Sequence, residues 1–155
     1  MWLKFVISGL IIAFCVFLGF VAAAKQRMRK KFFVQFAGFN ERYLNELSYA
    51  RKPLSEFLRE YEYSGDFAKT VSAFAQHRVT ESKLSYLTKD EKKLCADYFG
   101  MLGKGDAVSQ KSYFSSQKGE LNEKKTSSER EAKSRGELYL KLGLLAGLAF
   151  VILIV

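Results

Sequence analysis

Hydrophobic residues are concentrated at the two ends of this 155-residue chain, and an amphipathic region separates them. Residues 5–24 form an uncharged run that as a helix would span about 30 Å, the thickness of the hydrocarbon core of a bilayer. Residues 138–155 form a second apolar run, interrupted only by Lys141, whose long side chain can reach the membrane interface. The pattern predicts one transmembrane helix within 1–24 and another over 138–155.

The region between these runs shows helical periodicity. A typical stripe consists of Leu54, Phe57, Leu58 and Tyr61, which are spaced at i, i+3, i+4 and i+7. Neither the period-two alternation of strands nor a repeat of 20–50 residues is visible. The fold class predicted is therefore all-α, with a bundle of about four to six helices over residues 32–121.

Several residues mark where these helices begin and end. Pro53 suits the first turn of a helix, and Ser64-Gly65-Asp66 is typical of a stop followed by a new N-cap. Thr88-Lys-Asp-Glu91 fits a capping box, in which Thr and Glu each satisfy a backbone amide. Residues 78–87 are ambiguous and are expected to hold one short turn, so the helix count around residues 78–88 stays open.

The last helix is expected to begin after Asp106 as N-cap and to continue into the second apolar run. Residues 122–137 are mostly polar, but they lack proline and contain no glycine before Gly136. We therefore expect a polar helical stalk over 122–137 that is continuous with the C-terminal span; a frayed linker is the alternative. The unbroken helix would be about 75 Å long.

The net charge of +9 is distributed unevenly. Residues 32–138 carry 18 basic and 16 acidic side chains, a net charge of only +2. Five basic residues and no acidic residue form a juxtamembrane segment over 25–31: Lys25, Arg27, Arg29, Lys30 and Lys31. Cations at this position gain roughly 1 kcal/mol each from anionic lipid headgroups. This segment predicts a membrane-lipid contact and accounts for the excess charge without a nucleic-acid partner.

The same basic segment predicts the topology. Basic residues follow the first apolar run and also precede the second, so the positive-inside rule places the middle of the chain in the cytoplasm. A cleaved signal peptide ending at Ala22-x-Ala24 would instead leave an extracytoplasmic helical interaction domain. The length of the apolar run and the order of its flanking charges favour an uncleaved membrane helix. A holin-like, lipid-remodelling protein is a third reading, which the large charged domain disfavours.

Two glycines in the second apolar run are four residues apart. Gly143 and Gly147 form a GxxxG motif, which lets another helix approach closely. The neighbour could be the first membrane helix, another protein, or a second copy in a homo-oligomer. Alternatively, the two glycines are merely small residues of the kind common in membrane helices and have no role in helix packing.

No residue pattern indicates catalysis, a metal site or a cofactor. Gly103-Lys104-Gly105-Asp106 lacks the length, hydroxyl and preceding strand of a phosphate-binding loop and is better explained as a turn between helices. His77 has no partner at metal-ligand spacing, and Cys15 and Cys95 are expected to be small apolar fillers. We therefore predict that the protein is not an enzyme.

Three stretches together resemble a known family. Residues 46–54 (ELSYARKPL), 102–110 (LGKGDAVSQ) and 142–147 (LGLLAG, followed by an aliphatic run) are similar in order and spacing to elements of the stage III sporulation protein AB family of endospore-forming bacteria. The resemblance covers essentially the whole chain.

The resemblance implies a role in spore formation. It implies a non-enzymatic scaffold of the channel assembly between mother cell and forespore, located in the mother-cell membrane and similar to platform proteins of type II secretion. Its cytoplasmic domain would dock a partner ATPase, stage III sporulation protein AA, beside other channel components. Of the residues that carry the resemblance, Tyr49 and Gln110 are the candidates for partner contacts.

Overall fold

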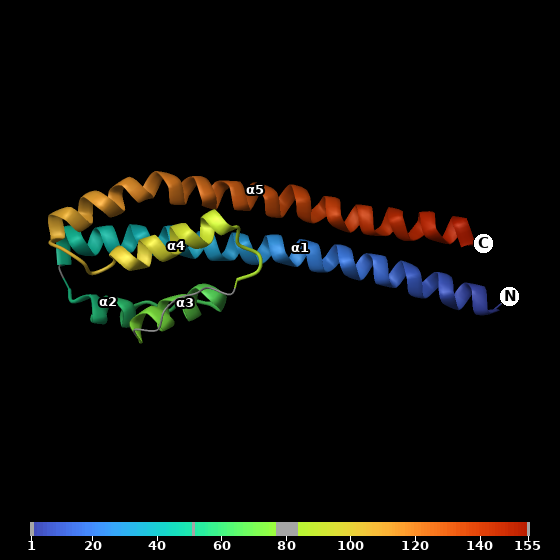
Figure 1. Cartoon of the computed structure of the whole chain (residues 1–155), viewed down its shortest axis with the longest axis horizontal. Coiled ribbons are helices and arrows are strands. Elements are labelled where there is room, and N and C mark those ends of the chain that lie inside the picture. Colours follow the sequence, from blue (N-terminus) through green and yellow to red (C-terminus); the bar gives the residue numbers. More distant parts are fainter. Residues whose placement is uncertain (1, 51, 77–83, 155) are drawn as a thin grey trace. The chain divides into compact units, whose positions relative to one another are not determined.

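Every element of the fold is helical. The computed structural model describes residues 2–50, 52–76 and 84–154, and no strand occurs among them. The elements are α1 (Trp2–Asn45), a π-helical turn η1 (Glu46–Ala50), α2 (Leu54–Glu60), α3 (Gly65–Ala75), α4 (Lys89–Met101) and α5 (Ala107–Ile154) (Figure 1). The predicted all-α class is confirmed. The π-helical turn was not expected from the sequence.

The chain divides into two compact units. Met1–Lys30 and Ser127–Val155 form one, which we call the hairpin unit, and Lys31–Thr126 form the other, which we call the bundle unit. The division of α5 falls within residues 122–137, which the sequence marks as a polar stalk. Helices α1 and α5 each contribute residues to both units, so the chain passes between the units without leaving helical structure.

The bundle unit has an aromatic core. Helix α1 directs a row of rings inward, and the other four helices add rings that meet it; the buried members include Phe32, Phe33, Phe36, Phe39, Tyr43, Phe57, Phe67, Tyr98, Phe99 and Phe114. Tyr98 lies at the centre, with ring centroids 4.8 Å from Phe36 and 4.7 Å from Phe114 in edge-to-face contact. Each such contact contributes about 0.5–1.5 kcal/mol beyond simple burial. Segments of all five α-helices thus share one core.

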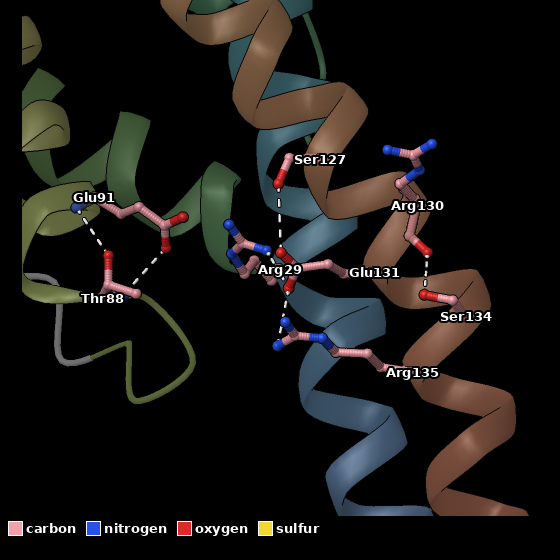
Figure 2. A network of polar contacts seen from close by, with 8 residues as sticks. All are labelled: Arg29, Thr88, Glu91, Ser127, Arg130, Glu131, Ser134 and Arg135. Atoms are coloured by element: carbon pink, nitrogen blue, oxygen red, sulfur yellow. Dashed lines mark hydrogen bonds and ion pairs between the residues drawn. The ribbon is translucent and has the colours of Figure 1, made fainter.

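Most predicted helix ends are observed. Thr88 and Glu91 form the capping box, with hydrogen bonds of 3.2 and 3.0 Å (Figure 2). The carboxylate of Asp106 accepts from the amide of Val108 at 3.2 Å, which caps α5. Two helix starts differ from the sequence-based expectation, that of α2 by one residue and that of α3 by two. Pro53 is the N-cap of α2, and Ser64 rather than Asp66 is the N-cap of α3.

Helix α5 is uninterrupted from Ala107 to Ile154, so the polar residues 122–135 are helical. The N-terminal part of the ambiguous segment, residues 78–83, lies outside the described residues. After it, the amide of Leu87 donates to the carbonyl of Leu84 at 3.3 Å, which forms one short turn before α4.

Candidate functional site

The two apolar segments pack against each other in the hairpin unit through their glycines. A Cβ atom placed on Gly19 would lie 2.6 Å from the carbonyl oxygen of Tyr139, and one on Gly143 would lie 2.8 Å from that of Cys15. On Gly147 it would lie 3.1 Å from the Cα of Ile12. Because the numbering rises along α5 as it falls along α1, the two segments run antiparallel (Figure 1). At Gly19 and Gly143 only glycine permits this approach, and at Gly147 a Cβ would require its neighbour to shift.

The outward faces of these segments are apolar. Large exposed side chains occur along both: Val6, Leu10, Phe14, Phe17, Leu18, Leu142, Leu144, Leu145, Leu148, Phe150 and Ile152. Within the described residues one helix, near the N-terminus, is long and apolar enough to cross a membrane, which is consistent with membrane association. The second span over 138–155 and the orientation of both stay predictions.

The predicted basic segment is not uniform. Lys25 and Arg27 are exposed, whereas the side chain of Arg29 is only 12% exposed. Its guanidinium lies 3.1 Å from the carboxylate of Glu131 in α5 (Figure 2). Arg135 approaches the same carboxylate at 3.6 Å. Arg29 therefore links the two helices of the hairpin unit as well as adding to the basic flank.

A buried polar network joins three helices of the bundle unit. The side-chain amide of Asn40 donates to the carbonyl of Phe114 at 3.1 Å, and the hydroxyl of Tyr98 donates to the amide oxygen of Asn40 at 2.9 Å. Burial raises the pKa of Tyr98 well above its usual value, so this hydroxyl remains a donor across the physiological range. The network fixes α1, α4 and α5 in register.

Sequence reasoning missed this network. Asn40 interrupts an otherwise apolar face of α1 between Phe36 and Tyr43, and a polar residue in a core stripe is the signal that could have indicated it. No comparable signal indicated the Arg29–Glu131 pair, because both residues stand in runs of other charged side chains.

The two candidate partner-contact residues have different environments. Tyr49 lies in η1 and is 86% exposed. Gln110 is only 8% exposed; its amide oxygen accepts a hydrogen bond from the hydroxyl of Tyr43, and its amide nitrogen lies 3.4 Å from the carbonyl of Gly105. The structure does not bring the two side chains together in any contact, and Gln110 has an internal partner. Both partner contacts stay predictions.

Side chains typical of reaction centres are sparse. Among the described residues, no group of three or more His, Cys, Asp or Glu side chains is placed to hold a metal ion. Cys95 is buried, which raises the pKa of its thiol from 9.0 to about 12 and keeps it protonated. His77 lies outside the described residues. Gly103 and Gly105 have positive φ angles of 76° and 84°, as a tight turn between helices requires.

These features define a class: an all-helical protein in which an antiparallel apolar hairpin and a helical bundle share two long helices. The family model for stage III sporulation protein AB matches residues 4–155, and the chain belongs to this family. It is therefore a sporulation-related protein, and its family is not known as an enzyme family. No curated protein and no solved structure matches the chain.

Proposed function

We propose that the protein is a non-enzymatic membrane scaffold of the channel assembly between mother cell and forespore, and that its bundle unit docks a cytoplasmic ATPase, stage III sporulation protein AA. One observation carries the proposal. The apolar hairpin is built from α1 and α5, which also contribute to the bundle, so any load on the bundle reaches the hairpin through continuous helix. A scaffold that anchors a motor requires this kind of connection.

In this proposal both apolar segments span the mother-cell membrane and the bundle lies in the cytoplasm. The outward apolar side chains would contact lipid, and the exposed Lys25, Arg27, Lys30 and Lys31 would contact anionic headgroups. A reporter fused after Leu121 tests the orientation. A fluorescent protein that folds in the cytoplasm should be active there, and alkaline phosphatase should be inactive; active phosphatase would refute the cytoplasmic bundle.

The alternative function is an extracytoplasmic interaction domain released from a signal peptide by cleavage after Ala24. The glycine contacts count against it, because Ile12, Cys15 and Gly19 all belong to the segment that cleavage would remove. Loss of that segment would expose Gly143 and Gly147 without their neighbours. The mass of the protein isolated from sporulating cells decides between the two, since cleavage would remove 24 residues.

Docking of the ATPase is tested by purifying the two proteins together from sporulating cells. The scaffold proposal fails if affinity-tagged protein brings down neither the ATPase nor other channel components. Tyr49→Ala is expected to weaken docking by about tenfold, because exposed aromatic side chains often dominate interfaces. Its folding stability should be unchanged. Gln110→Ala is less diagnostic, since it also removes the acceptor of Tyr43.

A further inference from the structure

The bundle unit has an open groove of about 1000 Å³ among α2, α3, α4 and the turn that follows α4. Its apolar lining includes Leu54, Leu58 and Phe74, which pack against the core but remain partly exposed. The aromatic core ends here with apolar surface that the described residues do not cover completely. A groove of this kind can accept apolar side chains from a partner.

The charged side chains of the groove are all of one sign. Arg59 from α2 and Lys104 from the turn after α4 line it, and no carboxylate does so among the described residues. Neither cation forms an ion pair with another described residue, and both are exposed. Apolar surface flanked by cations therefore calls for an apolar partner with negative charges beside it.

The polar groups of the groove favour a protein segment over a small molecule. Small-molecule sites orient their ligand with a few converging, well-placed polar groups. Here the five polar lining residues are all exposed: Ser55, Arg59, Ser72, Gln76 and Lys104. We propose that the groove binds an amphipathic helix of a partner protein, with its apolar face on Leu54, Leu58 and Phe74 and its carboxylates beside Arg59 and Lys104. This inference rests on the proposed docking function and locates it.

Gly100 offers a way to fill the groove without disturbing the core. It lies in α4 and lines the groove, and a Cβ atom placed on it would meet no atom within 4 Å. Gly100→Phe should therefore occupy the groove with a ring while leaving the charge unchanged. Gly119→Phe is the matched control, because Gly119 is also an exposed helical glycine with open space around it but does not line the groove.

The first test uses designed peptides and the full chain in detergent micelles. A fluorescent amphipathic helix built from Leu and Glu is compared with a twin built from Leu and Lys. We expect the acidic peptide to bind the wild type and Gly119→Phe about tenfold or more tightly than it binds Gly100→Phe or the double variant Arg59→Glu/Lys104→Glu. The basic twin should bind the wild type about tenfold more weakly than the acidic peptide does. Equal binding of the acidic peptide to the two glycine variants, or equal binding of both peptides to the wild type, overturns the inference.

The second test uses the purified ATPase and separates the inference from the proposed function. If the ATPase binds the wild type and Gly119→Phe but not Gly100→Phe, both are supported. Equal binding to all three overturns the groove as the docking site and leaves the scaffold function standing. If the ATPase does not bind the wild type, the docking function fails and the peptide comparison alone decides the groove. The protein can also be tested for self-association. If the wild type and Gly119→Phe self-associate but Gly100→Phe does not, the groove binds a second copy of this chain, and the inference of a partner helix is overturned.

Discussion

Gly143 of α5 lies directly against the backbone carbonyl of Cys15 in α1: a Cβ atom at Gly143 would be 2.8 Å from that oxygen. Real Cβ atoms do not approach backbone oxygens so closely, and the obstructing atom belongs to the backbone and cannot rotate away. In the proposed membrane location, lipid would supply no hydrophobic driving force for two apolar helices to associate, so close packing would supply much of the association free energy. The Gly143–Cys15 contact is therefore central to the stability of the hairpin.

Gly143→Leu should force the two apolar segments apart. We expect the free energy of unfolding in detergent micelles to fall by about 1–3 kcal/mol, which is the typical cost of overpacking a well-packed interior. Gly9→Leu is the matched control, because Gly9 lies in the apolar part of α1 and a Cβ there would meet no atom within 4 Å. Circular dichroism during denaturation measures both. Equal stability of the two variants would mean that the glycine contact is not tight.

Tyr98→Phe should destabilise the bundle although it removes a single oxygen. The hydroxyl of Tyr98 donates to the amide oxygen of Asn40 at 2.9 Å, and its loss leaves a buried acceptor without that donor. Such a loss costs about 1–3 kcal/mol. Tyr49→Phe provides the control, since Tyr49 is exposed and should tolerate the change within about 0.5 kcal/mol. If both variants unfold at the same denaturant concentration, the hydrogen bond contributes nothing.

The sequence predicted the features that depend on interactions between residues close together in the chain. The capping box at Thr88, the cap at Asp106 and the helical state of residues 122–135 follow from neighbouring side chains and from the absence of helix breakers. The GxxxG motif indicated a close helix contact but left the neighbour open. Segments of α1 far away in sequence supply that neighbour, and nothing near Gly143 specifies it.

The candidate site was less accessible from sequence. A motif suggested Gln110 as a partner contact. In the structure its side chain is buried and accepts a hydrogen bond from Tyr43, and both features depend on how α1 and α5 pack together. The groove beside Arg59 and Lys104 is formed by three helices and a turn, so no single stretch of sequence predicts it. Tertiary packing decides both features.

The thiol of Cys95 should be unreactive in the folded protein. Burial raises its pKa from 9.0 to about 12, so near neutral pH the thiolate fraction is about a thousandfold lower than in the unfolded chain. In a Cys15→Ala background, a thiol reagent at pH 8 should react with Cys95 at least a hundredfold faster after unfolding. Similar rates before and after unfolding would show that the thiol is accessible.

The same shift predicts how stability depends on alkaline pH. The unfolded thiol loses its proton near pH 9, whereas the folded thiol holds it to about pH 12. The unfolded state is therefore favoured progressively above pH 9, and stability should fall by up to about 1.4 kcal/mol per pH unit from this group. Cys95→Ala should lower this slope relative to the wild type between pH 9 and 11. An unchanged slope would contradict the assignment to Cys95.

The Arg29–Glu131 pair should couple the two helices of the hairpin unit measurably. The two side chains are 12% and 27% exposed and 3.1 Å apart, so water screens them less than it screens a surface pair. A double-mutant cycle with Arg29→Ala and Glu131→Ala should give a coupling free energy of about 1 kcal/mol. The matched control is Lys118–Glu41, a pair at 3.8 Å whose side chains are 53% and 54% exposed, for which coupling should be close to zero. Raising the salt to 1 M should leave most of the first coupling in place, because the screening ions cannot reach a pair that is largely covered by protein. If salt abolishes it, or if both cycles give the same value, the pair acts as an ordinary surface contact.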